Sequence, residues 1–163
     1  MTSSKNIKNN KQQKLKKLPK NRKLKTIKKI LVPLDGSKQS FRALDMAISL
    51  SSHYSSSITG IYVFDLPPSL KFAVIDPVGE KLRKKILDVM QKANLRCNDQ
   101  KILFKSILIN GNVGQDIIRQ AKKGKFDLII MGKRSISSTS EVFLGSISHY
   151  VIHHSKIPVF IVK

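Results

Sequence analysis

Short apolar runs alternate with segments of helical periodicity along most of this 163-residue chain. The apolar runs cover residues 28–34, 58–64, 101–109, 126–131 and 158–162, and each is short enough to be a buried strand. Apolar residues at helical spacing fill the intervals, at residues 37–55, 78–93, 113–121 and 147–152. Strands that alternate with helices form a parallel sheet with right-handed crossovers. The sequence therefore predicts an α/β fold, a three-layer α/β/α sandwich around five parallel strands.

Positive charge is concentrated at the N-terminus. The net charge is +21, residues 1–29 hold eleven Lys and one Arg without an acid, and all ten acidic residues lie beyond residue 34. The same segment has five aliphatic Leu and Ile residues and no aromatic, too little apolar surface to form a core. We expect a disordered basic tail over residues 1–27 and one domain over residues 28–163.

Several classes of protein are excluded by what the sequence lacks. Cys97 is the only cysteine, and His149 and His153, four residues apart, have no third ligand nearby, so neither a disulfide nor a metal site is predicted. No run of about twenty apolar residues exists, and the N-terminus lacks the apolar core of a secretory signal. We expect a cytoplasmic protein without a membrane span.

Glycines near the C-terminus form a pattern suited to phosphate. Gly132 follows a strand, and after a polar loop Gly145 and Ser146 stand at the head of a helical segment. A glycine turn and a helix start present free N–H groups and a positive helix end to an anion. The alternative is ordinary turn and cap chemistry, which any α/β fold needs.

The spacing of these residues is similar to the G-x2-G-x9-G-[ST] signature of the universal stress protein family. Gly132, Gly145 and Ser146 match it, and Ser135 stands where the family has its second glycine. The first strand, which ends in Asp35-Gly36-Ser37, and the turn at residues 111–114 add to the resemblance over residues 28–163. It implies the Rossmann-like fold of the adenine nucleotide alpha hydrolases, strand order 3-2-1-4-5, and an ATP site, with Mg²⁺ as a candidate companion ion.

The resemblance also implies which residues hold the nucleotide. Asp35 and Val63 would lie at the adenine side, and the loop after the fourth strand and the next helix start would hold ribose and phosphates. The full set is Pro33, Asp35, Val63, Met131, Gly132, Arg134, Ser135, Gly145, Ser146, Ile147 and Ser148. Two positions keep alternatives: Asp35 could be only a turn or cap residue, and Ser135 could block or contact phosphate.

The sequence favours a binding module over an enzyme. It contains no Walker A motif, no inferable Ser-His-Asp arrangement and no carboxylate pair, so at most slow ATP hydrolysis is expected. The predicted function is a regulatory module of a stress response that binds ATP or another adenine nucleotide. The alternative is a nucleotide-free dimeric module whose basic tail binds nucleic acid or another acidic partner.

Two partners are predicted besides the nucleotide. The apolar terminal strand would lie at a sheet edge, where family members commonly pair, so a homodimer through this C-terminal strand is expected. Residues 5–29 could contact nucleic acid without sequence preference, act as a solvated arm, or contact an anionic membrane surface.

Overall fold

The computed structural model describes residues 26–65, 77–133 and 145–163. The predicted tail lies almost entirely outside the described residues. Five strands, β1 (Lys29–Pro33), β2 (Ser57–Phe64), β3 (Phe104–Asn110), β4 (Leu128–Gly132) and β5 (Val159–Val162), form one sheet. All neighbouring strands pair in parallel, and their order is β3-β2-β1-β4-β5. The α/β class and the strand order are confirmed.

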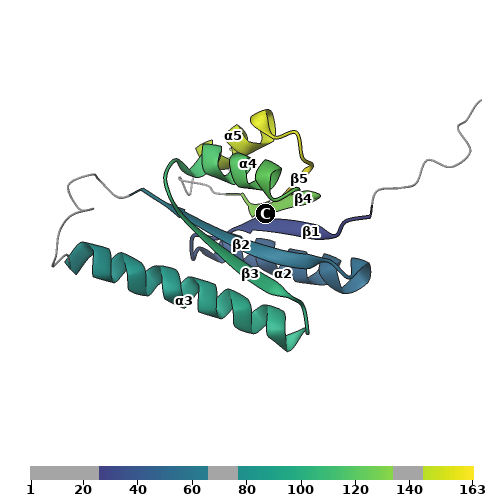
Figure 1. The fold of residues 1–163 in the computed structure, drawn as a ribbon, viewed down its shortest axis with the longest axis horizontal. Coiled ribbons are helices and arrows are strands. Elements are labelled where there is room, and N and C mark those ends of the chain that lie inside the picture. The colour runs from purple at the N-terminus through teal and green to yellow at the C-terminus, as the bar shows by residue number, and fades with distance from the viewer. Residues whose placement is uncertain (1–25, 66–76, 134–144) are drawn as a thin grey trace, which may run out of the picture.

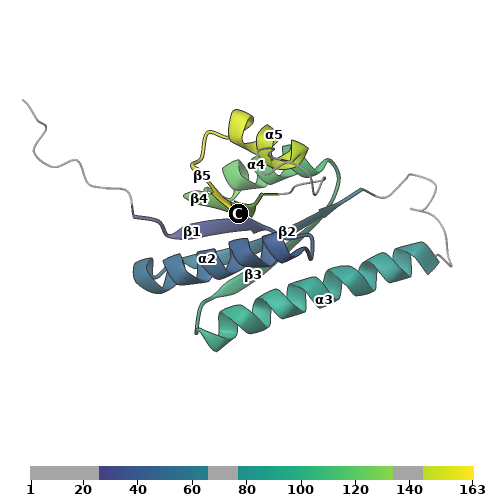
Figure 2. The same ribbon diagram turned by 180° about the vertical axis from the view of Figure 1, so that it is seen from behind.

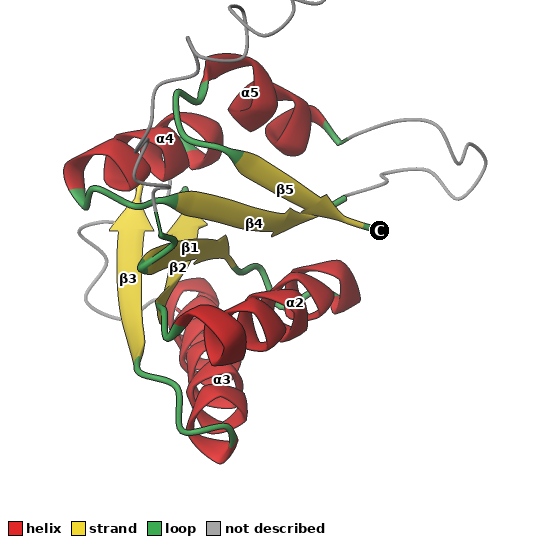
Figure 3. Cartoon of the chain, turned by 90° about the vertical axis from the view of Figure 1, so that its right-hand side faces the viewer, coloured by secondary structure: helices red, strands yellow, loops and turns green. Residues whose placement is uncertain are grey.

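Helices cover both faces of the sheet, as the two opposite views show (Figures 1 and 2). Helices α2 (Lys38–Tyr54) and α3 (Pro77–Asp99) lie on one face. Helices α4 (Val113–Lys123) and α5 (Ser146–His154) lie on the other, and Figure 3 shows them beyond β4 and β5. This is the three-layer sandwich that the sequence predicts.

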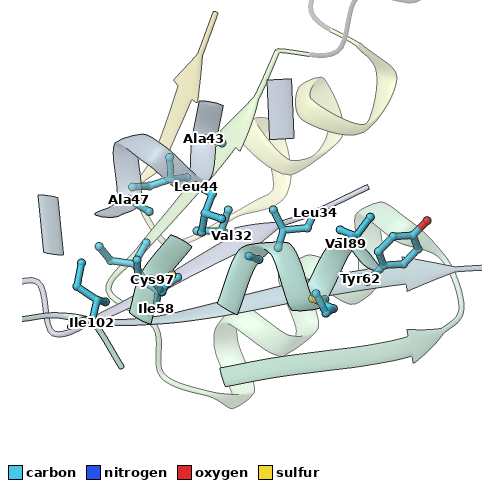
Figure 4. Close-up of a cluster of buried hydrophobic side chains, with 14 of the residues drawn as sticks. Val32, Leu34, Ala43, Leu44, Ala47, Ile58, Tyr62, Val89, Cys97 and Ile102 are labelled. Carbon is cyan, nitrogen blue, oxygen red and sulfur yellow. The ribbon is translucent and has the colours of Figure 1, made fainter. Parts of the chain in front are cut away.

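Alternate residues of the strands enter two separate cores. In β1, Ile30 and Val32 join the core beneath α2 and α3, whereas Leu31 joins the core beneath α4 and α5. Figure 4 shows the first core, where Ala43, Leu44 and Ala47 of α2 meet the sheet. Because both faces of a central strand are buried, its sequence is a continuous apolar run. This explains why β1 and β4 are easily recognised in the sequence.

The ends of some elements differ from the sequence-based expectation. Residues 101–103 form a turn before β3, in which Lys101 has a positive φ of 56°, so the strand begins later than expected. Helix α3 extends from Pro77 to Asp99, beyond both ends of the helical spacing at residues 78–93. Proline fits the first turn of a helix because the N–H it lacks has no intrahelical acceptor there.

The direction in which successive strands are added to the sheet reverses at β1, since β2 and β3 lie on one side of it and β4 and β5 on the other. The residues after β1 and those after β4 meet at the carboxyl edge of the sheet, where the strand order switches direction. In open α/β sheets ligands bind outside the strands at this switch point. The fold therefore directs attention to the turns that follow β1 and β4.

Candidate nucleotide site

A cavity of about 110 Å³ lies at the switch point. The ends of β1, β2 and β4 and the first turns of α2, α4 and α5 surround it. Apolar residues from the strands and from α4 make up much of its wall, and polar groups come from the turn after β1 and from α5. Its lining residues are Pro33, Leu34, Asp35, Ser37, Gln39, Ser40, Ile61, Val63, Val113, Ile117, Met131, Gly132, Ile147 and Ser148.

The turn between β1 and α2 is fixed by hydrogen bonds of its own residues. The Ser37 N–H donates to Asp35 Oδ1 at 2.9 Å, and the Ser37 side chain accepts from the Ser40 N–H at 3.1 Å as the N-cap of α2. Gly36 between them has a φ of +85°, a conformation that side chains disfavour. Asp35 thus serves as a turn residue, one of the two roles weighed for it, and it also lines the cavity.

Gly132 has a packing reason to be glycine. A Cβ at this position would lie 2.6 Å from the carbonyl carbon and oxygen of Gln39, in the first turn of α2. Real Cβ atoms do not approach backbone atoms so closely, so β4 and α2 can meet here only because Gly132 has no side chain. The first glycine of the pattern is therefore explained without a ligand.

Helix α5 begins at the cavity with Gly145 as its N-cap and Ser146 as its first residue. The His149 N–H donates to the Gly145 carbonyl at 2.9 Å and starts the helical pattern. In an α-helix the N–H groups before that residue have no intrahelical acceptor and form the positive end of the helix dipole. The Ser148 hydroxyl donates to the Gly145 carbonyl at 2.9 Å, so its proton already has an acceptor.

Nine of the eleven residues predicted from the sequence fall in described parts of the chain. Seven of them line the cavity: Pro33, Asp35, Val63, Met131, Gly132, Ile147 and Ser148. Gly145 and Ser146 do not line it and stand at the start of α5 beside it. Arg134 and Ser135 lie outside the described residues, as do the other residues of the polar loop before Gly145, from 136 to 144.

The remaining lining residues of the cavity were not predicted from the sequence. Ser37, Gln39 and Ser40 come from the first residues of α2, and Val113 and Ile117 come from the start of α4. The turn at residues 111–114 is part of the family resemblance. Nothing in its sequence shows that α4, which begins there, reaches the same cavity. For α2, the hydroxyls that follow Asp35-Gly36 were the available signal.

This arrangement suits a ligand that is flat and apolar at one end and anionic at the other. Leu34, Ile61, Val63 and Met131 offer apolar contact at the strand ends. Three helices, α2, α4 and α5, begin at the cavity and direct their positive ends toward it. No group of three or more His, Cys, Asp or Glu side chains placed to hold a metal occurs within residues 26–65, 77–133 and 145–163.

Known proteins share both the sequence and the fold. The model of the universal stress protein family matches residues 26–163. Universal stress protein YxiE of Bacillus subtilis is 31% identical over 145 residues, which cover 83% of this chain and 98% of that protein. The solved structure of MJ0577 of Methanocaldococcus jannaschii has 26% identity and a TM-score of 0.74, covering 85% of this chain and 97% of that one.

A solved universal stress protein in complex with cAMP also shares the fold, with 22% identity and a TM-score of 0.66, covering 85% of this chain and 98% of that chain. At this identity the likeness concerns the fold alone. The family model spans all nine described helices and strands, from the residues before β1 to the C-terminus. This chain belongs to the universal stress protein family.

Proposed function

We propose that this protein is a regulatory module of a stress response that binds an adenine nucleotide, ATP first among them, in the cavity at the switch point. The observation that carries the proposal is the convergence of residues from the ends of three strands and the starts of three helices on one cavity. Asp35 and Met131 are 96 positions apart in the printed sequence and both line it.

The cavity accounts for only part of a nucleotide. Its volume of about 110 Å³ lies well below the roughly 300 Å³ at which pockets for drug-sized ligands begin. The adenine ring would occupy this apolar floor beside Val63, and ribose and phosphates would extend toward Gly132 and the start of α5. Arg134 and Ser135 lie two and three residues after Gly132 in the sequence. We therefore assign them to the phosphates, together with Mg²⁺ when it accompanies ATP.

Calorimetric titration with ATP, ADP, AMP and cyclic AMP tests the proposal. We expect ATP binding to the wild type, and its loss in Val63→Trp, which fills the cavity, and in Gly145→Trp, which crowds the start of α5. Leu108→Trp is the matched control, because Leu108 lies on the neighbouring strand β3 away from the cavity and is 50% exposed. Equal binding by Val63→Trp and Leu108→Trp would place the nucleotide elsewhere.

A nucleotide-free module is the second candidate. It is favoured by Gly132, whose contact with Gln39 requires glycine in the absence of any ligand, and by Ser135 at the position of the family's second glycine. Ser135→Gly distinguishes the two. No binding by the wild type together with binding by Ser135→Gly would show that this chain has lost the ligand and retained the fold.

A further inference from the structure

The amino edge of the sheet, opposite the nucleotide cavity, carries a group of exposed lysines. They are Lys28, Lys101, Lys122, Lys123, Lys125 and Lys156, here called the basic edge. Lys28 directly precedes β1, Lys101 precedes β3, the three residues 122, 123 and 125 precede β4, and Lys156 precedes β5. Because all strands are parallel, the segments that precede them meet at one edge.

Backbone hydrogen bonds tie these segments together. The Ser57 N–H donates to the Lys28 carbonyl at 2.9 Å, and the Ile58 N–H donates to the Leu103 carbonyl at 3.0 Å. On the other side, the Asp127 N–H donates to the Lys29 carbonyl at 2.9 Å, and the Ile129 N–H donates to Pro158 at 3.0 Å. The basic edge thus forms one surface held on a rigid frame.

Opposite charges do not balance this surface. The ion pairs found among the described residues, such as Lys84 with Glu80 and Arg96 with Asp45, involve the helices and none of the six lysines. One nearby acid, Asp127, has Oδ2 at 3.0 Å from the Lys28 N–H and 3.1 Å from the Lys29 N–H, so this carboxylate binds backbone. The edge keeps a net positive charge.

Favourable interactions with helix dipoles explain most, but not all, of the six lysines of the basic edge. Lys122 and Lys123 lie in the last turn of α4, where cations are favoured by the negative end of the helix. Lys101, Lys125 and Lys156 lie in the turns beyond helix ends, and Lys28 lies before a strand. Lys101, Lys125 and Lys156 each lie two residues beyond a helix end, close enough for the same dipole to favour them, so only Lys28 lacks this reason to be basic.

A polar hollow opens on the same edge. It measures about 460 Å³ and is lined by five serines between positions 51 and 57, together with Gln100, Lys101, Ile102 and Leu103. Ser51 is 2% exposed, and its hydroxyl has no hydrogen-bond partner among the described residues. Because this hydroxyl is buried, it is not offered to a ligand in the hollow, and the polar groups at the mouth come from its exposed neighbours.

Phosphates in a row fit this surface better than a lone anion does. From β3 to β5 the sheet is four strand spacings wide, about 19 Å, which corresponds to between five and six base pairs of duplex at about 3.4 Å each. The sequence that leads into this edge, residues 1–25, adds ten Lys and Arg residues and no acid. Lysine ammonium groups are standard donors to phosphate oxygens. The hydroxyls of Ser52, Ser56 and Ser57 already donate to backbone carbonyls, so the lysines are the donors of this surface.

We propose that the basic edge binds the phosphate backbone of nucleic acid without sequence preference. This surface is distinct from the nucleotide cavity, since the two lie at opposite ends of the same strands. The interaction therefore does not depend on the proposed nucleotide site, and its test is carried out without nucleotide.

Fluorescence anisotropy of a labelled DNA duplex, measured with the full chain over about 50 to 200 mM salt, tests the proposal. The edge variant is Lys122→Gln, Lys123→Gln and Lys125→Gln. The control variant is Lys81→Gln and Lys85→Gln on α3 with Lys105→Gln on β3, which removes the same charge from exposed positions outside the basic edge and leaves the tail intact. Thermal melting checks that both variants fold.

The edge variant is expected to bind more weakly than the control, with the slope of log K against log salt reduced by up to about 3 relative to the wild type. Equal losses in the two variants would assign binding to the tail or to net charge and would overturn the proposal. Absence of duplex binding by the wild type, with retained binding to vesicles containing phosphatidylserine, would also overturn it in favour of a membrane surface.

Discussion

At Gly132 the backbone of β4 approaches α2 so closely that only a hydrogen atom fits between them. This contact joins the two turns that form the cavity, because Gln39 on one side and Gly132 on the other both line it. A residue that looks like part of a ligand motif is therefore also a packing residue. Experiments can distinguish its role in packing from a role in ligand binding, because the packing against Gln39 is present without ligand.

Gly132→Ala should destabilise the ligand-free protein by about 1 to 3 kcal/mol, the usual cost of an extra methyl group in a filled space. Urea unfolding followed by circular dichroism measures it. Ser49→Ala, at an exposed position of α2, is the control and should change stability by less than about 0.5 kcal/mol. A Gly132→Ala protein as stable as the wild type would show that β4 and α2 do not meet as described.

Cys97 is a residue whose burial has a chemical consequence. Burial, and next the carboxylate of Asp45, raise the pKa of its thiol to about 11. Since the thiolate is the reactive species, iodoacetamide at pH 8 should modify Cys97 slowly in the native protein and rapidly in urea. Fast native labelling would contradict the packing of α3 against the sheet.

The same shift in pKa makes stability depend on pH. The thiol loses its proton more readily in the unfolded chain than in the folded one, so rising pH favours unfolding between about pH 9 and pH 11. Stability should therefore fall over this range more steeply for the wild type than for Cys97→Ala. Parallel curves in denaturant titrations at several pH values would refute this.

At the scale of secondary structure, the start of α2 links helix stability to the site. Ser37 caps this helix and lines the cavity, and the Ser37 N–H donates a hydrogen bond to the carboxylate of Asp35. Ser37→Ala should cost about 1 kcal/mol by the loss of the cap, whereas Ser37→Asp, another good N-cap residue, should retain most of the stability. Equilibrium unfolding of the two variants measures the difference, and equal losses would contradict the capping role.

The elements that the sequence predicts best are those with the strongest patterns. β1 and β4 are buried on both faces, so their runs of Ile, Leu and Val are continuous, and their ends are displaced by one or two residues at most from the expectation. β3 was placed too early, because Ile102 and Leu103 are apolar although they belong to a turn. Periodicity cannot distinguish apolar residues that precede a strand from the strand itself.

The site was predictable where its residues end strands or begin α5, as Ile147 and Ser148 do. Val63, Met131 and Gly132 stand at strand ends and line the cavity, as the resemblance implies. Gln39, Val113 and Ile117 reach it through the packing of α2 and α4, which no local pattern records. The contributions of Arg134 and Ser135 stay predictions.

At the scale of the whole molecule, the sheet has two free edges of different character. The edge strand β3 carries Lys105, a charge that discourages strand pairing, whereas β5 is a run of Val, Phe, Ile and Val without a charge. Phe160 on β5 is 43% exposed. An uncharged apolar edge strand supports the proposal that a second copy of the chain pairs with β5.

Phe160→Lys should therefore convert a dimer to a monomer at micromolar concentration, as measured by sedimentation velocity. Leu108→Lys is the matched control, because it introduces the same charge at a half-exposed position of the opposite edge strand. It should leave the dimer intact. A wild type that sediments as a monomer, or a dimer broken equally by both changes, would exclude pairing through β5.

The parallel arrangement of the strands also affects how the sequence of this chain can evolve. Residues that end the strands surround the cavity, and residues that precede them form the basic edge, roughly 17 Å away along a five-residue strand. A substitution in one set of turns leaves the other set untouched. Selection can thus alter the proposed nucleotide cavity and the proposed nucleic-acid surface as two separate inherited traits carried by a single core.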